Sequence, residues 1–215
     1  MPNLVIFGAS DFGEEIAQLV YDINQTQEKW KLLGFLDDNE SLWAMERSGI
    51  PVLGGRAWLA AEKRDLQVVI AIGNVRARKI IATTVEDFGY QCPPLIHPSV
   101  LLANNVKVGN GSLICARSIL STHVSIGNHT IINMGCIVGH NSQVGTYTTV
   151  NPHTSIAGGV KVGESVYIGI GATVIDKVMI QDGATIGAGS AVMSEIPENT
   201  TAIGVPARVM WTKGG

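Results

Sequence analysis

The chain of 215 residues lacks any hydrophobic run long enough to cross a bilayer. Its longest apolar stretches, residues 4–7 and 68–72, have the length of buried strands. The N-terminus also lacks a basic region followed by a long apolar segment, which is the pattern of a secretory signal. These absences predict a cytoplasmic protein that has no membrane partner.

Cysteine is scarce, and the three cysteines, Cys92, Cys115 and Cys136, have neither paired nor metal-ligand spacing. We expect them to be core thiols. The formal net charge of −3 gives no basic surface for nucleic acid. His123 and His129 stand six residues apart, on successive corners of the repeat described below, too far apart to share a tetrahedral zinc ion. We therefore expect no metal and no nucleic-acid partner.

Charge becomes sparse in the second part of the chain. Residues 1–95 contain nine Lys/Arg and thirteen Asp/Glu, whereas residues 96–215 contain only six and five. Ser, Thr, Asn and Gly replace them, as expected for a stack of repeats in which charges would align in like-sign rows. The change predicts two domains, residues 1–95 and residues 96–215.

A strict period of six residues dominates the second domain. An aliphatic residue stands at every sixth position, and a small or β-branched residue usually stands two positions before it. The aliphatic set is Leu102, Val108, Ile114, Leu120, Ile126, Ile132, Val138, Val144, Val150, Ile156, Val162, Ile168, Val174, Ile180, Ile186 and Val192. This period is typical of a parallel β-helix, in which each side of a triangular coil is one short strand and one corner. Three such hexads make a coil, so residues 18 apart should stack at about the 4.8 Å strand spacing.

The first domain alternates strands and helices. Residues 3–7, 32–36, 52–55 and 67–72 are predicted strands; residues 14–23, 58–63 and 75–88 are predicted helices. Units of this kind build a small, open, Rossmann-like parallel sheet, which binds ligands at the carboxyl ends of its strands.

Three of those strand ends carry glycine or polar residues. They are Gly8-Ala9-Ser10-Asp11-Phe12-Gly13, Asp37-Asp38 and Gly73-Asn74. Ser10 stands where the dinucleotide fingerprint needs a second glycine, and a lone glycine turn is also a common tight connection. The three ends together nevertheless favour a nucleotide-type ligand, with Asp37 and Asp38 toward the ribose or base and Gly73-Asn74 toward a phosphate or base. Nothing resembles a hydride-transfer site.

Five motifs follow one another along the chain. They are Ile6-Phe7-Gly8-Ala9-Ser10-x-x-Gly13, Phe35-Leu36-Asp37-Asp38, Ala71-Ile72-Gly73-Asn74, the hexads, and Gly204-Val205-Pro206-Ala207-Arg208. The NeuD/PglD sugar acetyltransferases have these motifs in the same order, and the chain resembles that family over nearly its whole length. The resemblance implies a left-handed β-helix, a homotrimer, acetyl-CoA between neighbouring coils and a nucleotide sugar on the first domain.

His140 is the candidate catalytic residue. It follows the inward Val138 by two, so it lies at a corner, and Gly158 stacks over it 18 residues later. An imidazole beside a backbone N–H suits acyl transfer, because one accepts a proton while the other stabilises an oxyanion. The family pattern also implies that His140 is catalytic and that Gly158 contacts the acetyl carbonyl.

The resemblance further implies a pantetheine channel along Gly169, Ile170 and Ala188, and the 18-residue rule stacks Ile170 under Ala188. Arg208 is a candidate for the CoA phosphates, or else a solvated arginine. Asn133 stacks under Asn151, where the pair either contacts sugar or a neighbouring subunit or closes a corner as an asparagine ladder.

Two positions depart from the family pattern. Asn141 replaces an acidic residue that would polarise the imidazole, and Phe12 replaces a histidine that meets the sugar nucleotide. An amide orients imidazole but stabilises imidazolium less than a carboxylate does.

The sequence therefore predicts an acetyl-CoA-dependent N-acetyltransferase that acts on a nucleotide-linked amino-dideoxy sugar for surface glycan assembly. An O-acetyltransferase for a sialic-acid-type sugar and a non-catalytic trimeric binding or scaffold protein remain as alternatives. The first of these leaves the nucleotide-like loops without a ligand, and the second leaves the pairing of His140 with Gly158 to chance.

Overall fold

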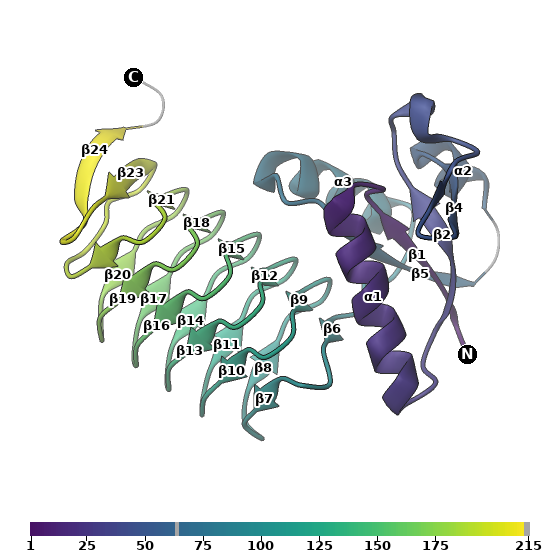
Figure 1. The fold of residues 1–215 in the computed structure, drawn as a ribbon. Coiled ribbons are helices and arrows are strands. Elements are labelled where there is room, and N and C mark those ends of the chain that lie inside the picture. The colour runs from purple at the N-terminus through teal and green to yellow at the C-terminus, as the bar shows by residue number, and fades with distance from the viewer. Residues whose placement is uncertain (63–64, 213–215) are drawn as a thin grey trace. The chain divides into compact units, whose positions relative to one another are not determined.

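The structure is a computed structural model that describes residues 1–62 and 65–212. The chain divides into two compact units, Met1–Pro98 and Ser99–Gly215 (Figure 1). The α/β unit and the β-helix expected from the sequence are both confirmed. Across the described ranges, no helix combines the length and apolar character needed to span a membrane.

The first unit is a five-stranded sheet in the order β3-β4-β2-β1-β5. Its strands are β1 (Asn3–Phe7), β2 (Lys31–Leu36), β3 (Glu46–Arg47), β4 (Ile50–Gly54) and β5 (Leu66–Ile70), with β6 (Leu95–Ile96) near the end of the unit. Its helices are α1 (Asp11–Thr26), the 3-10 turn η1 (Glu40–Leu42), α2 (Arg56–Ala61) and α3 (Val75–Asp87). β1, β2, β4 and β5 are parallel, and only the β3–β4 hairpin is antiparallel.

The first unit matches the sequence expectation closely at its centre. β1 begins and ends where predicted, and Leu4, Val5 and Ile6 are fully buried in it. The short helix begins at Arg56, two residues earlier than expected, and the last residue of its prediction, Lys63, lies outside the described residues. β3 and η1 are too short to give a periodic signal, so the sequence did not predict them.

The second unit is a left-handed parallel β-helix with three faces. One face contains β7 (Leu101–Leu102), β10 (Ile119–Leu120), β13 (Ile137–Val138), β16 (Ser155–Ile156), β19 (Thr173–Val174) and β22 (Ala191–Val192). The second contains β8 (Lys107–Val108), β11 (Ser125–Ile126), β14 (Gln143–Val144), β17 (Lys161–Val162) and β20 (Met179–Ile180). The third contains β9 (Leu113–Ile114), β12 (Ile131–Ile132), β15 (Thr149–Val150), β18 (Tyr167–Ile168), β21 (Thr185–Ile186) and β23 (Thr200–Ile203).

Every strand pair from β7 to β22 confirms the expected stacking of residues 18 apart, whereas β23 pairs with β21 at a separation of 16 residues. Ile119 pairs with Ile137, Ile137 with Ser155, and Ser155 with Thr173, without a register shift. From Ile114 onward each residue of the aliphatic set is buried. Leu102 is 40 % exposed and Val108 is half-buried, so the expectation that these two are also core residues is wrong. The first coil has no earlier repeat beneath it within this unit.

Buried hydroxyl groups join the coils. The Ser142 Oγ donates to the carbonyl of Ala157 (2.9 Å) and accepts from the Val160 N–H (3.1 Å). Thr148 makes the equivalent pair of bonds to Gly163 and Val166. A buried hydroxyl without such partners would cost free energy, so these bonds explain why Ser and Thr occupy inward positions.

The corners have one backbone conformation in common. Every sixth residue from 111 to 189 has a positive φ, between 50° and 69°. Only some of these residues are glycine; others include His123, Asn141 and Lys177. The left-handed conformation is unfavourable for most side chains, and its repetition gives the chain its sharp turn at each corner.

The C-terminal end of the coil is closed by a hairpin. β23 pairs with β21 on one side and, antiparallel, with β24 (Arg208–Thr212) on the other. The sequence suggested only a tail at this position, because the hexad period ends at Val192.

Replacing Ile156 with alanine should lower the free energy of unfolding by about 2–5 kcal/mol, because this side chain is 1 % exposed and its removal leaves a cavity between stacked coils. The matched control is Lys161→Ala on the outer face of β17, which should change stability by about 0.5 kcal/mol or less. Urea unfolding followed by circular dichroism measures both. Equal effects of the two substitutions would contradict the assignment of the interior.

Candidate active site

The three predicted strand ends of the first unit lie at one edge of the sheet. β1 has β2 on one side and β5 on the other, all parallel, so their carboxyl ends are neighbours. Gly8 directly follows β1, Asp37 directly follows β2, and Ala71 directly follows β5. The expectation that these segments come together is therefore met.

The glycine turn after β1 is closed tightly by its neighbours. Gly8 has φ of +118°, and its N–H donates to the carbonyl of Leu36 (2.7 Å). A Cβ atom on Gly8 would lie 2.5 Å from the Ala71 carbonyl oxygen, and one on Gly13 would lie 2.0 Å from the Gly8 carbonyl oxygen. Both glycines are therefore required by packing of the turn.

Asp37 holds this turn to the next strand end. Its Oδ2 accepts from the Ala9 N–H (3.0 Å) and its Oδ1 accepts from the Asn39 N–H (2.9 Å). Each oxygen has a second lone pair that a ribose or base could use. Asp37 is thus a structural residue of the site, whatever it contacts in a ligand.

The other carboxylates at this edge are paired with arginines. Asp38 Oδ2 lies 2.8 Å from Arg56 Nε, and the Arg47 Nη2 donates to Asp11 (2.8 Å) and to Glu14 (2.7 Å). The hydrogen bond that Ser48 donates to Glu14 lowers the pKa of this carboxyl group, and the nearby Arg47 lowers it further. The Glu14 carboxylate in turn raises the pKa of Arg47. Sequence reasoning missed Arg47, because β3 is too short to be predicted.

Ser10 and Phe12 lie beside this ion pair at the start of α1. Ser10 occupies the N-cap position without a side-chain hydrogen bond, and Phe12 is half-buried.

Gly73 and Asn74 form the third strand end. The Asn74 Oδ1 caps α3 by accepting from the Ala77 N–H (2.9 Å). A Cβ atom on Gly73 would have no neighbour within 4 Å, so this position is open. Behind it, Arg78 is 1 % exposed and donates to the carbonyls of Ile72 (2.7 Å) and Gly73 (3.0 Å). Arg78 therefore orients the segment from within, a role that the sequence did not reveal.

His140 lies at an exposed corner between β13 and β14, as predicted. Its carbonyl accepts from the Gly159 N–H (2.8 Å), which fixes the next coil above it. Its Nδ1 lies within hydrogen-bonding distance of the Asn141 side-chain amide (3.0 Å). Asn141 itself has φ of +57°, a conformation that asparagine tolerates better than most residues.

Gly158 stands directly against the imidazole. A Cβ atom there would lie 2.6 Å from both Cε1 and Nε2 of His140. Only glycine therefore leaves room for the ring in this position. No hydrogen bond joins the Gly158 N–H to another of the described residues, so this donor is free at the same corner as the imidazole. The pairing of His140 with Gly158, expected from the 18-residue spacing, is present.

The predicted donor-binding residues occupy a different corner. Gly169 and Ile170 follow β18, and Ala188 follows β21 one coil later. The Gly189 N–H donates to the Ile170 carbonyl (2.8 Å), which confirms the stacking, and Ile170 is 54 % exposed. A Cβ atom on Gly169 would lie 2.5 Å from the Ala188 nitrogen. Arg208 is exposed at the start of β24.

The two stacked asparagines bond to the coil backbone. The Asn133 Oδ1 accepts from the Met134 N–H (2.8 Å), and the Asn151 Nδ2 donates to the Ile168 carbonyl (2.7 Å). These contacts are those of corner-closing residues. A contact of Asn133 with sugar stays a prediction.

The remaining histidines differ from one another. His123 and His153 are exposed, as expected, but His129 is 1 % exposed and stacks on Tyr147 with ring centroids 5.4 Å apart. The expectation that His129 lies at the surface or at a subunit interface is wrong, because its own chain buries it. Tyr147 stands 18 residues later, so its aromatic ring stacks on the imidazole of His129. His97 Nε2 lies 3.1 Å from Asp22 Oδ2.

The cysteines are buried and free. Burial raises the pKa of Cys92 to about 12 and that of Cys136 to about 11, which makes both poor nucleophiles at neutral pH. No group of three or more His, Cys, Asp or Glu within residues 1–62 and 65–212 could hold a metal ion.

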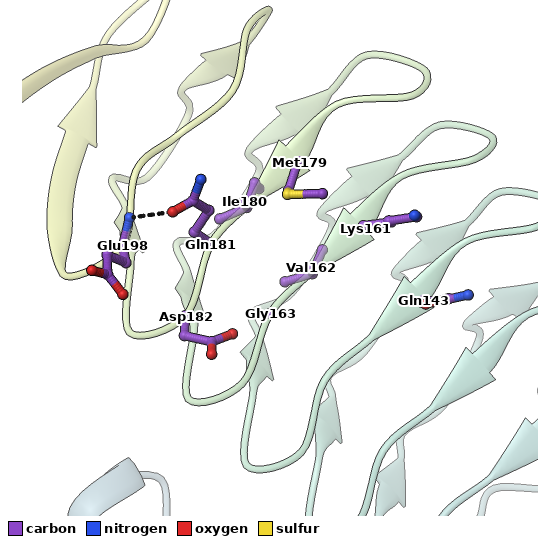
Figure 2. Close-up of a pocket in the computed structure, with 9 residues that line it drawn as sticks. All are labelled: Gln143, Lys161, Val162, Gly163, Met179, Ile180, Gln181, Asp182 and Glu198. Carbon is purple, nitrogen blue, oxygen red and sulfur yellow. Dashed lines mark hydrogen bonds between the residues drawn. The ribbon is translucent and has the colours of Figure 1, made fainter.

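A depression of about 340 Å³ lies on the second face of the coil (Figure 2). Lys161, Gln181 and Glu198 are among its lining residues, and the Gln181 Oε1 accepts from the Glu198 N–H (3.3 Å). No predicted site residue lines it. The candidate functional residues are instead those of two separate places: the corner at His140 in the second unit, and the strand ends of the first unit.

Both units of the chain are similar to known proteins. Residues 3–85 match the model of the PglD N-terminal domain. Curated proteins of known function gave no significant match. Among solved structures, PerB from Caulobacter crescentus, in complex with CoA and GDP-perosamine, is 29% identical with a TM-score of 0.85, and 98% of each chain is covered.

Two further structures match over the same length. The acetyltransferase domain of PglB from Neisseria gonorrhoeae is 26% identical with a TM-score of 0.89, covering 98% of this chain and 100% of that one. WeeI from Acinetobacter baumannii is 28% identical with a TM-score of 0.88 and the same coverage. Residues 3–85 therefore match the PglD N-terminal domain, and the resemblance of the whole chain to the NeuD/PglD sugar acetyltransferases is confirmed.

Proposed function

We propose that this protein transfers the acetyl group of acetyl-CoA to the amino group of a nucleotide-linked amino-dideoxy sugar used in surface glycan synthesis. The observation that carries the proposal is the corner at which the His140 imidazole lies against Gly158, whose N–H bonds to no other of the described residues. The full-length similarity to PerB, which was crystallised with CoA and GDP-perosamine, supports the choice of both substrates.

His140 accepts the proton that the sugar amine loses as its nitrogen attacks the thioester carbonyl carbon. The Gly158 N–H donates to the oxygen that becomes negative in the tetrahedral intermediate. When the carbon–sulfur bond breaks, the proton held by His140 passes to the CoA sulfur, which leaves as a thiol. The net change is one new amide bond for one thioester bond.

Asn141 determines which ring nitrogen of His140 is free. Its amide carries a donor and an acceptor, so a half-turn about its last side-chain bond lets Oδ1 accept from Nδ1–H instead. In that form the lone pair is on Nε2, the atom beside Gly158. An amide gives the imidazolium less support than a carboxylate, and an amine acceptor requires a weaker base than a hydroxyl. This favours N-acetylation over the O-acetylation of a free sugar.

The corner at Gly169, Ile170 and Ala188 would receive the pantetheine arm of CoA. The small side chains of Gly169 and Ala188 would let the pantetheine arm lie close to the coil backbone, and the exposed Ile170 offers it an apolar contact. Arg208 would pair with a CoA phosphate. The strand ends of the first unit would hold the nucleotide, and Asn133 remains the candidate for the sugar.

The working enzyme on this proposal is a homotrimer. Leu101, Ile119 and Ile137 form a row of apolar side chains on adjacent strands of one coil face, and they are 65 %, 37 % and 43 % exposed. A second copy of the chain would cover this row.

The reaction is tested by incubating the protein with acetyl-CoA and a panel of GDP-, UDP- and dTDP-linked 4-amino-4,6-dideoxy sugars. One member should gain an acetyl group by mass spectrometry, with release of free CoA. The matched 4-hydroxy sugar nucleotide should stay unmodified. Acetylation of free sialic acid alone would favour the O-acetyltransferase, and no binding of CoA or sugar would favour a scaffold.

Sedimentation equilibrium should give a mass three times that of the 22.8 kDa chain. The apolar row is the physical reason, because a monomer would leave it in water. A stable monomer at working concentration would contradict the homotrimer.

Replacing His140 with alanine should lower kcat by about 10²–10⁴, the contribution typical of general-base catalysis. CoA affinity should change little; variants of the Caulobacter enzyme that lack one histidine were crystallised with both CoA and GDP-perosamine. His153→Ala, at another exposed corner, is the matched control and should retain full activity. Near-full activity of the His140 variant would rule out its role as the base.

A further inference from the structure

Trp43 is an exposed aromatic residue at the ligand-binding edge of the first unit. It follows η1, which begins three residues after Asp37 at the end of β2, and it is 39 % exposed. Trp30, by contrast, is 3 % exposed and belongs to the core of the same unit. The exposure of Trp43 is therefore not a general property of the tryptophans of this unit.

The polar edge of the Trp43 indole is already bonded. Its Nε1–H donates to the carbonyl oxygen of Asp37 at 2.7 Å. Indole has no other hydrogen-bonding group, so a ligand can meet only the ring's apolar surface. A ring fixed at its polar edge and partly exposed is suited to stacking.

The backbone around Trp43 is fixed as well. The Trp43 N–H donates to the Glu40 carbonyl (3.1 Å), and the Ala44 N–H donates to Val52 of β4 (3.3 Å). Asp37, which accepts from the indole, is itself bonded to the glycine turn through Ala9. The ring is thus linked through one residue to the turn after β1.

We propose that Trp43 is the stacking platform for the nucleobase of the sugar nucleotide. This inference rests on the proposed function, because it assigns a contact within the same acceptor site. Planar bases stack on aromatic side chains irrespective of their hydrogen-bonding edges, so Trp43 would supply affinity for the base.

The test uses three variants of the full-length protein and titrations with GDP, UDP and dTDP. Trp43→Leu should weaken binding of the preferred nucleotide by about 5- to 150-fold, the effect of losing one stacked base. Trp43→Phe keeps an aromatic face and should bind within a few-fold of the wild type. Trp58→Phe, a substitution of a half-buried tryptophan in α2, is the matched control.

Tryptophan fluorescence provides a readout that a purely structural role would not change. Nucleotide binding should quench the wild-type emission, because a stacked base is in contact with the indole. Trp43→Phe should bind without that quench, whereas Trp58→Phe should keep it. Ribose 5-phosphate, which has no base, should not quench the wild type at all.

The outcomes separate this inference from the proposed function. If the wild type binds nucleotide but Trp43→Phe keeps the full quench, the stacking role is wrong and the acetyltransferase proposal stands. Unchanged affinity in a folded Trp43→Leu variant also overturns it. If that variant fails to fold, the quench in Trp43→Phe still decides. Failure of the wild type to bind any nucleotide or nucleotide sugar would instead contradict the acceptor part of the proposed function.

Discussion

The requirement that each sixth side chain fill the inside of the coil determines the rest of the second unit. Val138, Ile156 and Val174 stack one above another in the same sheet, and all are buried. A chain that must return inward after six residues needs a sharp corner in each hexad, which the recurring positive φ angles provide. Residues 18 apart are then forced into contact. The placement of Gly158 against His140 is a direct consequence of this register.

The same constraint explains the chemistry available at the corners. Inward positions accept only aliphatic or small hydroxyl side chains whose bonds are completed by the next coil, as for Ser142. Functional groups are therefore confined to corners and outer faces, where their neighbours are set by the coil above and below. The coil supplies a rigid framework in which an imidazole and a backbone donor are held at fixed positions before any ligand binds.

The first unit follows a different logic, in which ligand contacts and structural contacts share residues. The Asp37 side chain bonds two backbone N–H groups, and its carbonyl orients Trp43. Asn74 caps α3, and the buried Arg78 bonds the carbonyl of Gly73. These internal hydrogen bonds hold the strand-end segments in place. Such preorganisation lowers the entropy that a ligand must overcome on binding.

Sequence reasoning was most successful where one physical rule governs many residues. The hexad period predicted the register of the coil, the inward set and the pairing of His140 with Gly158, because every coil obeys the same geometry. It failed for Leu102, whose coil has no earlier repeat beneath it, and for His129, whose burial depends on Tyr147 one coil away. The β23–β24 hairpin lies beyond the last hexad and carries no periodic signal.

In the first unit, strand ends could be predicted from glycine and polar residues, but individual side-chain roles could not. Trp43 and Arg47 belong to short segments without periodicity, so only their hydrogen bonds reveal them. The hydrogen bonds that the Asp37 carboxylate accepts are likewise invisible in the sequence. They come from the backbone N–H groups of Ala9 and Asn39, which any residue other than proline would provide.

The central claim is that one chain joins recognition of a nucleotide to acetyl transfer at a coil corner. The most direct measurement compares kcat/KM for the nucleotide-linked amino sugar with that for the same amino sugar carrying no nucleotide. The account predicts a large loss of kcat/KM without the nucleotide, with the added nucleoside diphosphate acting as a competitive inhibitor of the full substrate. Equal kcat/KM for the two sugars, and no inhibition by any nucleoside diphosphate, would contradict it.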